Sequence, residues 1–194
     1  MAGGDSSLRV VLLGPPGSGK GTQAKRLCEE LGVPHVSTGD MLRDAVAAGS
    51  ELGRRVEGIM RSGELVDDRT MAEVVRERLA KDDARDGFIL DGYPRNLSQA
   101  ETLDAILEAS GADLDAVVFL DVPEEELVRR ALGRKRADDT EEVIRERLRI
   151  FREQTEPLIG HYEERGLLEH VDGLGTVEEI TGRIEKVLDR ASGV

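Results

Sequence analysis

The stretch Leu8–Thr22, with the sequence LRVVLLGPPGSGKGT, limits what this chain can fold into more than any other part. Its apolar run Val10–Leu13 is typical of a strand that is buried on both faces. A glycine-rich turn follows, and Lys20 stands at the start of a helix, where the amino end carries partial positive charge. Glycines let such a turn aim successive backbone N–H groups inward. The pattern therefore predicts a phosphate cradle in which Lys20 reaches the β- and γ-phosphates of a nucleoside triphosphate.

The residue after the lysine departs from the general form of this loop. A serine or threonine usually stands there and contacts Mg²⁺, whereas this chain has Gly21, with Thr22 one position later. The usual direct ligation of the metal by the loop is therefore not expected. A plain turn that binds no ligand is the alternative, but it explains neither the lysine nor the glycines at Gly14, Gly17 and Gly19.

Composition limits the partners of the chain. Its 194 residues suffice for one domain with a full core, and we expect a single domain over residues 1–194. The formal charge of −13, with 35% charged and 3% aromatic residues, argues against a nucleic-acid partner, for which a basic stripe and stacking rings are expected. A polyanionic ligand must then be met by arginines that gather locally.

Patterns for zinc and for membranes are missing from the sequence. Cys28 is the only cysteine, so it cannot form an intramolecular disulfide or a cysteine-based zinc site. His35, His161 and His170 have no second ligand at metal-binding spacing, and we assign them structural roles. Residues 1–7 lack the apolar core of a signal peptide, and no apolar run approaches the roughly 18 to 20 residues of a membrane span. We therefore expect a cytoplasmic protein with no membrane partner.

Apolar runs alternate with helical patterns along the chain. Beyond the first strand, strands are expected at Val33–Val36, Phe88–Asp91, Ala116–Asp121 and Gly166–Asp172. This alternation predicts an α/β fold with a five-stranded parallel sheet and helices on both faces. Residues 140–165 read as one long helix that Thr140 caps and that is interrupted or kinked at Pro157.

Two short helices are expected between the second and third strands. Ser37 and its polar neighbours precede the first and can cap it, and Leu52–Arg61 forms the second. Because these helices carry little hydrophobic mass, residues 37–66 read as a small subdomain that moves against the core. An ordinary crossover connection is the alternative.

Charged residues follow the strands at the edge where ligands bind in open α/β sheets. Asp91 ends a buried strand, so it is placed to hold Mg²⁺ through water or to orient a phosphate-binding loop, and Arg95 follows at the same edge. A simple turn residue is the alternative for Asp91. Arg130 and Arg134 lie four residues apart and project from one face of a helix, with Arg136 shortly after. For this basic cluster, solvated charges without a ligand are the alternative.

Several motifs, in this order, resemble those of the adenylate kinases, within the nucleoside monophosphate kinase branch of phosphate-loop enzymes. They are GPPGSGKGTQ at Gly14–Gln23, STGDMLR at Ser37–Arg43, GELV at Gly63–Val66, LDGYPR at Leu90–Arg95 with Gln99, and RADD at Arg136–Asp139 leading to Arg147. They span nearly the whole chain, so the resemblance is far more specific than the phosphate loop alone. The Gly21–Thr22 pair, a departure from the general loop, is what this family has.

The resemblance implies reversible transfer of the γ-phosphoryl group of MgATP to AMP, which gives two ADP. It implies ATP contacts at Gly17, Ser18, Gly19, Lys20, Gly21, Thr22, Arg130, Arg134 and Gly175. It implies AMP contacts at Thr38, Arg43, Glu64, Leu65, Val66, Gly92, Tyr93, Pro94, Arg95, Gln99, Arg136 and Arg147. The expected catalytic residues are Lys20, Arg95, Arg136 and Arg147, and Gln99 is expected to contact the adenine edge of AMP.

The resemblance also implies a mobile lid, which falls at residues 133–139. Long-lid members of the family carry an insertion at this place, often with a zinc site, whereas only a few residues occupy it here. The chain therefore resembles the short-lid form. We expect a monomer that uses Mg²⁺ bound with ATP and carries no zinc.

Two other functions remain open at this point. A kinase of another monophosphate, such as UMP or CMP, shares the loop and the arginines, although Gln99 and Thr38 favour adenine. A binding module that senses or hydrolyses ATP is the alternative from a different class. Such a module leaves the basic residues around Arg95, Arg134 and Arg136 without an evident purpose.

Overall fold

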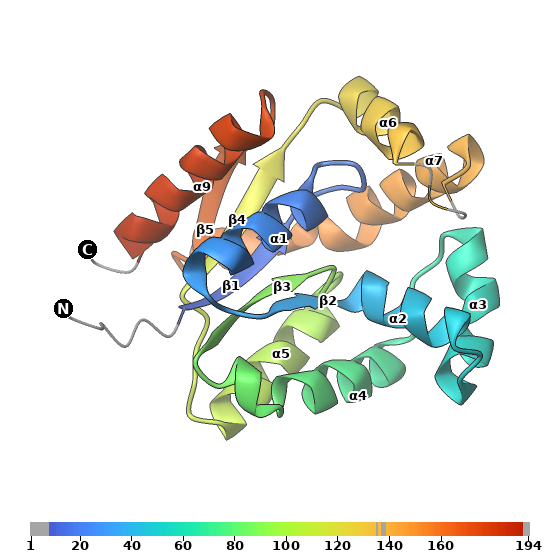
Figure 1. Cartoon of the computed structure of the whole chain (residues 1–194), viewed down its shortest axis with the longest axis horizontal. Helices are drawn as coiled ribbons and strands as arrows, with labels where there is room; N and C mark the ends of the chain where they lie inside the picture. Colours follow the sequence, from blue (N-terminus) through green and yellow to red (C-terminus); the bar gives the residue numbers. More distant parts are fainter. Residues whose placement is uncertain (1–7, 135, 137–138, 192–194) are drawn as a thin grey trace.

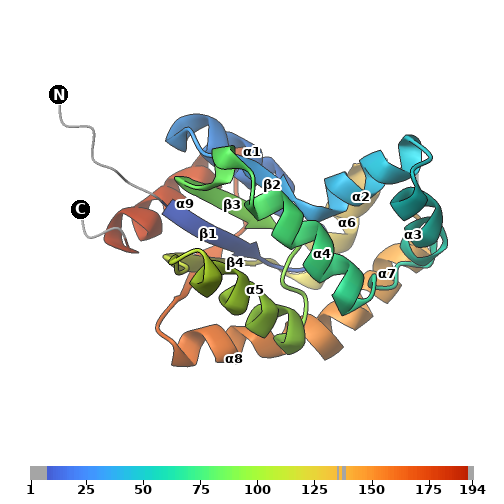
Figure 2. The same ribbon diagram turned by 90° about the horizontal axis from the view of Figure 1, so that it is seen from below.

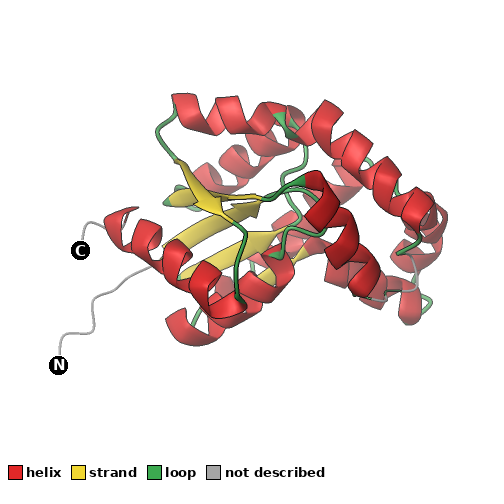
Figure 3. Ribbon diagram, turned by 90° about the horizontal axis from the view of Figure 1, so that it is seen from above, coloured by secondary structure: helices red, strands yellow, loops and turns green. Residues whose placement is uncertain are grey.

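The computed structural model describes residues 8–134, 136 and 139–191. The described residues form a five-stranded sheet in the order β2-β3-β1-β4-β5, with parallel pairing throughout and helices around it (Figure 1, Figure 3). The strands are β1 Leu8–Leu13, β2 His35–Ser37, β3 Gly87–Asp91, β4 Ala116–Asp121 and β5 Leu168–Asp172. This architecture confirms the α/β fold and the parallel sheet expected from the sequence.

The first strand lies at the centre of the sheet. β1 pairs with β3 on one side and with β4 on the other. Its side chains alternate between two hydrophobic clusters, with Val11 and Leu13 in one and Val10 and Leu12 in the other, and each is 3% exposed or less. A run that is apolar at every position is therefore buried on both faces of the sheet.

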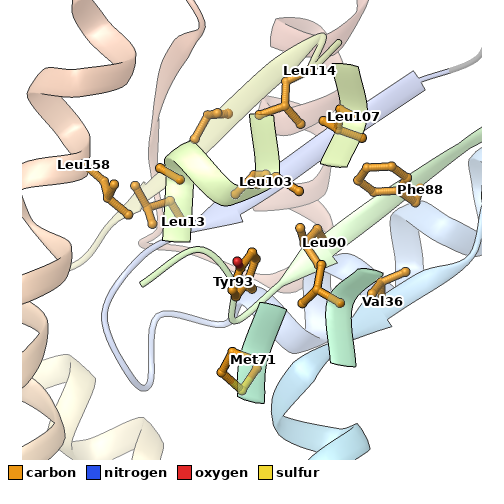
Figure 4. Close-up of a cluster of buried hydrophobic side chains, with 14 of the residues drawn as sticks. Leu13, Val36, Met71, Phe88, Leu90, Tyr93, Leu103, Leu107, Leu114 and Leu158 are labelled. Carbon is orange, nitrogen blue, oxygen red and sulfur yellow. The ribbon is translucent and has the colours of Figure 1, made fainter. Parts of the chain in front are cut away.

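Helices cover both faces. On one face lie α1 Lys20–Leu31 and α9 Val177–Ala191, and on the other lie α4 Asp68–Leu79, α5 Leu97–Ala109 and α8 Pro157–Glu164. Figure 4 shows part of the second face, where Met71 of α4 and Leu103 of α5 pack near Leu90 of β3. Among the described residues, no helix combines the length and the apolar character needed to cross a membrane.

Further helices of the described residues lie beyond the edge of the sheet at which the strands end (Figure 2). The bounds are α2 Thr38–Ala47, α3 Glu51–Ser62, α6 Glu124–Gly133 and α7 Glu141–Ile150. α2 and α3 are the two short helices expected between the second and third strands, and they pack closely because Gly53 has no side chain. A Cβ at Gly53 would lie 2.0 Å from the carbonyl oxygen of Ala45. The motion of this helix pair stays a prediction.

The long helix over 140–165 is interrupted, as expected, but the interruption lies before Pro157. Thr140 caps α7, and the chain then forms a π-helix, η2, at Phe151–Thr155 before α8 begins at Pro157. Proline has no N–H to donate and fits the first turn of a helix, so it starts α8 without a hydrogen-bonding defect. The irregularity is taken up by the preceding turn, where the N–H of Glu156 donates to the carbonyl of Phe151 at 2.8 Å.

Candidate active site

A cavity of about 620 Å³ opens at the edge of the sheet where β1 and β3 end. Its lining includes every residue that the sequence predicts to contact a nucleotide or metal: Gly17, Ser18, Gly19, Lys20, Gly21, Thr22, Thr38, Arg43, Glu64, Leu65, Val66, Asp91, Gly92, Tyr93, Pro94, Arg95, Gln99, Arg130, Arg134, Arg136, Arg147 and Gly175. The structure thus brings together side chains that are far apart in the sequence. Which nucleotide each residue contacts stays a prediction.

The phosphate loop connects β1 to α1. Gly17 and Gly19 have φ angles of 85° and 95°, in the left-handed region that favours glycine. Gly17 also lies against α6, since a Cβ there would be 2.3 Å from the carbonyl oxygen of Leu127. The loop is therefore held in a shape that presents the amino end of α1, where unpaired N–H groups and the helix dipole attract an anion.

Lys20 lies at this amino end, and its Nζ donates to the carbonyl oxygen of Pro15 at 3.2 Å. Burial lowers the pKa of Lys20 to about 8, against the attraction of the Asp91 carboxylate. The guanidinium groups of Arg95, Arg134 and Arg136 contribute to this lowering of the pKa, although less than burial does. The ammonium is therefore held where its positive charge is disfavoured, and a bound phosphate group would relieve that cost.

Arginines from separate elements converge on the same cavity. Arg43 lies on α2, Arg95 follows β3, Arg136 follows α6, and Arg147 lies on α7. Burial lowers the pKa of Arg95, which Asp91 opposes, and the nearby cations Arg147 and Arg43 lower it further. Burial and the charge of Arg43 likewise lower the pKa of Arg136. Cations that gather in this way repel one another, so the arrangement favours a polyanionic ligand.

Carboxylates and carbonyl groups orient these guanidinium groups. Arg43 donates to Oδ1 of Asp40 at 2.6 Å, and Arg95 donates through Nε to the carbonyl of Gly92 at 2.8 Å. Oδ1 of Asp139 accepts from both Arg134 and Arg147 at 3.2 Å. Of the predicted lid at 133–139 and its RADD motif, Lys135, Ala137 and Asp138 lie outside the described residues.

Arg130 joins three parts of the site. It donates through Nε to Oε1 of Glu126 at 2.6 Å, which fixes its side chain along α6. Its terminal nitrogens donate to the carbonyl of Gly173, after β5, at 2.9 Å and to the carbonyl of Ser18 at 3.4 Å. The planar guanidinium therefore lies next to the phosphate loop, with two of its nitrogens directed at backbone oxygens.

Asp91 ends β3 and is only 8% exposed. Burial alone would raise the pKa of its carboxyl group, but His35, Lys20 and Arg95 together hold that pKa below its usual range. The carboxylate is therefore ionised. Nε2 of His35 lies 3.4 Å from Oδ2 of Asp91, a contact that the sequence did not predict. Among the described residues, no group of three histidine, cysteine or acidic side chains is arranged to hold a metal ion by itself.

Two further contacts of the site are not predicted from the sequence. The buried hydroxyl of Thr155, in η2, donates to the carbonyl oxygen of Arg95 at 2.6 Å. The carboxylate of Asp68, in the first turn of α4, accepts a hydrogen bond from Nε2 of Gln99 at 3.0 Å. No local pattern marks either residue, because each partner lies far along the chain.

In this parallel sheet, the first strand leads through a glycine-rich loop to a lysine, and arginines gather opposite that loop. These features define a nucleotide-binding protein of the phosphate-loop class. Comparisons with known proteins narrow this class. The family model described as "Adenylate kinase" matches residues 12–167. The chain therefore belongs to the adenylate kinase family.

Curated relatives match over nearly their full length. The adenylate kinase of Thermobifida fusca is 54% identical over 180 residues, which cover 91% of this chain and 95% of that protein. The adenylate kinase of Thermus thermophilus is 53% identical over 188 residues, 95% of this chain and 98% of that protein. That of Stenotrophomonas maltophilia is 52% identical over 181 residues, 91% of this chain and 97% of that protein.

Proposed function

We propose that this chain is an ATP:AMP phosphotransferase, which reversibly transfers the γ-phosphoryl group of MgATP to AMP and yields two ADP. Membership in the adenylate kinase family supports this reaction. The observation that carries the proposal is the convergence, around one cavity, of the phosphate loop with arginines from α2, α7 and the segments after β3 and α6. Two phosphate-bearing ligands explain such a concentration of cations in a protein whose formal charge is −13.

ATP would occupy the part of the cavity next to the phosphate loop. Its phosphates would lie on the backbone of Gly17–Thr22, with Lys20 at the β- and γ-phosphates. Arg130 would pack on its adenine ring, and its hydrogen bonds to the carbonyl groups of Ser18 and Gly173 support a fixed guanidinium plane at that place. Arg134 and the backbone near Gly175 would complete the ATP contacts.

AMP would occupy the part of the cavity next to α2 and the segment after α3. Arg43 and Arg95 would hold its phosphate, and Gln99 would contact the adenine edge, with further contacts from Thr38, Glu64–Val66 and Gly92–Pro94. Arg136 and Arg147 would reach the phosphates during transfer. We propose that residues 37–66 and the short lid at 133–139 close over the two nucleotides.

Catalysis in this proposal is positioning together with stabilisation of charge. Phosphoryl transfer proceeds through a loose transition state, in which arginines aimed at the moving group are worth on the order of 10³ to 10⁵ in rate. The accepting oxygen of AMP is already ionised, so the chain needs no general base. Closure around the ligands would exclude the water that otherwise hydrolyses ATP.

The residues of the site fit Mg²⁺, which ATP would bring with it. Asp91 offers an ionised, nearly buried carboxylate, and a Cβ built on Gly21 would lie 3.7 Å from its Oδ2, so this oxygen faces the phosphate loop. Asp91 would hold the ion through water. When bound, Mg²⁺ would neutralise part of the negative charge of the phosphates.

An assay of nucleotide choice tests the proposal. The purified chain is given MgATP with AMP, GMP, CMP or UMP, and ADP is measured with a coupled enzyme system that detects it. We expect fast ADP formation with AMP, little with the other monophosphates, and almost none when the acceptor is omitted. Preference for UMP or CMP would contradict the proposal, and so would ADP formation that does not require a monophosphate.

We further propose that the enzyme works as a cytoplasmic monomer without nucleic-acid or membrane partners.

A further inference from the structure

The side-chain amide of Gln99 is held at both ends. Gln99 is 1% exposed, yet it lines the cavity. Its Oε1 accepts the backbone N–H of Arg95 at 2.8 Å, and its Nε2 donates to Oδ1 of Asp68 at 3.0 Å. The same Asp68 oxygen accepts from Nδ2 of Asn96 at 2.9 Å, and Oδ1 of Asn96 accepts the N–H of Gln99 at 2.9 Å. The amide therefore belongs to a closed network that joins α4 to the start of α5.

This network permits one orientation of the amide. If the amide of Gln99 rotated by half a turn, its NH₂ group would face the N–H of Arg95, two donors against each other. Its oxygen would then face the carboxylate of Asp68, two acceptors against each other, because a carboxylate cannot donate. Unpaired polar atoms in a buried place are costly, so the two contacts act together to keep oxygen toward Arg95 and nitrogen toward Asp68.

The fixed amide has chemical consequences for a base in the cavity. One N–H of Nε2 and one lone pair of Oε1 have no partner within the described part of the chain, so they are left for a ligand. A 6-aminopurine such as adenine offers a matching pair, an exocyclic amino group that donates and a neighbouring ring nitrogen that accepts. A 6-oxopurine, such as hypoxanthine or guanine, places a carbonyl oxygen where the amino group would be, and this oxygen would repel Oε1.

We propose that Asp68 determines the base specificity of the acceptor site, as a positioning residue that locks the Gln99 amide in the orientation that accepts a 6-aminopurine and rejects a 6-oxopurine. The inference rests on the proposed function, since it takes AMP to be the acceptor. Asp68 itself acts only through Gln99. The backbone N–H of Arg95 supports the lock from the other end of the amide.

The test compares AMP with IMP, which differ at the purine 6-position and in the protonation of the adjacent ring nitrogen. In Asp68→Ala the carboxylate that accepts from Nε2 of Gln99 is gone, so only the N–H of Arg95 still orients the amide. We expect the ratio of kcat/KM for AMP to that for IMP to fall by about tenfold, which is the effect of one buried hydrogen bond. The KM for AMP should rise, and the KM for ATP should stay unchanged.

Two controls separate positioning from a general structural effect. Asp67 caps α4 through the N–H of Thr70 at 2.9 Å and does not touch Gln99, so Asp67→Ala should lower stability without changing the AMP-to-IMP ratio. In a Gln99→Leu background there is no amide to orient, so Asp68→Ala should no longer change the ratio.

Each outcome decides the inference. It is overturned if Asp68→Ala leaves the ratio unchanged in the wild-type background, if it has the same effect when Gln99 is leucine, or if Asp67→Ala changes the ratio equally. If the wild-type chain transfers phosphate to AMP but Asp68→Ala leaves the ratio unchanged, the inference alone is contradicted. A wild-type chain that does not use AMP contradicts the proposed function, and the inference with it.

Discussion

Replacement of Lys20 by methionine should make the protein more stable while almost abolishing activity. Methionine keeps the length and the apolar stem of lysine but removes the charge. In the proposed function, Lys20 contacts the β- and γ-phosphates, and loss of a single such contact costs on the order of 10²–10³ in turnover. Stability should change in the opposite direction, because the protein buries this ammonium among other cations before any nucleotide binds.

The magnitude follows from the pKa of Lys20. Folding lowers that pKa from 10.5 to about 8, and each unit corresponds to about 1.4 kcal/mol, so the charged group costs the folded state about 3 kcal/mol at neutral pH. Lys20 keeps part of its surface in solvent, which reduces this cost, and methionine also loses the hydrogen bond to Pro15, worth about 1 kcal/mol. We therefore expect Lys20→Met to raise the free energy of unfolding at pH 7 by about 1 to 2 kcal/mol.

The extra stability of Lys20→Met over the wild-type protein should decrease as the pH rises. Below pH 8 the lysine is protonated in both the folded and the unfolded chain, so the full difference is present. Between pH 8 and 10.5 the unfolded chain binds a proton that the folded chain releases, so the wild-type protein gains stability relative to the variant. The gap between the two proteins should therefore narrow over this range.

Urea unfolding at several pH values, together with the ATP and AMP assay, measures both effects. Lys186→Met, at an exposed position on α9, is the matched control and should change neither stability nor turnover appreciably. A Lys20→Met variant that is clearly less stable than wild type at pH 7, or a gap that stays constant between pH 8 and 10, would refute the reasoning.

Three other predictions concern the same site. Arg95→Ala should lower turnover by on the order of 10³ while the circular dichroism spectrum stays unchanged, and full activity in the folded variant would contradict its role. Thr155→Val should cost about 1 to 2 kcal/mol of stability and lower kcat, because the carbonyl of Arg95 loses a buried donor; Thr155→Ser should retain both, and an equal loss in that variant would refute the assignment. A zinc-selective chelator with excess Mg²⁺ should change neither stability nor activity, whereas activity lost and then restored by zinc would contradict the expectation.

The sequence predicts the parts of the fold that depend on neighbouring residues. The apolar run Val10–Leu13, the turn glycines and the cap at Thr140 each carry their own local signal, and the corresponding strand, loop and helix are found where expected. The strand order β2-β3-β1-β4-β5 has no such signal. The place where the long helix is interrupted also differs from the prediction, because Pro157 starts a new helix and the π-helix precedes it.

The candidate site likewise contains residues that a local sequence pattern predicts and residues that no local pattern predicts. Residues with a motif of their own, such as Lys20 and Arg95, are predicted by the sequence, and they line the same cavity. The residues that hold the predicted site residues in place have no such motif. Asp68 and Thr155 each act through a hydrogen bond to a distant part of the chain, separated by 31 residues from Gln99 and by 60 from Arg95. Only the three-dimensional arrangement brings such pairs into contact.

In the proposed function, one cavity holds two nucleotides, and a phosphoryl group passes from one to the other. The most direct measurement starts from ADP and Mg²⁺ alone and follows the phosphorus resonances by NMR after the purified chain is added. We expect ADP to be converted into ATP and AMP in equal amounts, and the same final mixture to be reached from equal amounts of ATP and AMP. ADP that stays unchanged, or that yields inorganic phosphate in place of ATP, would contradict the proposed function.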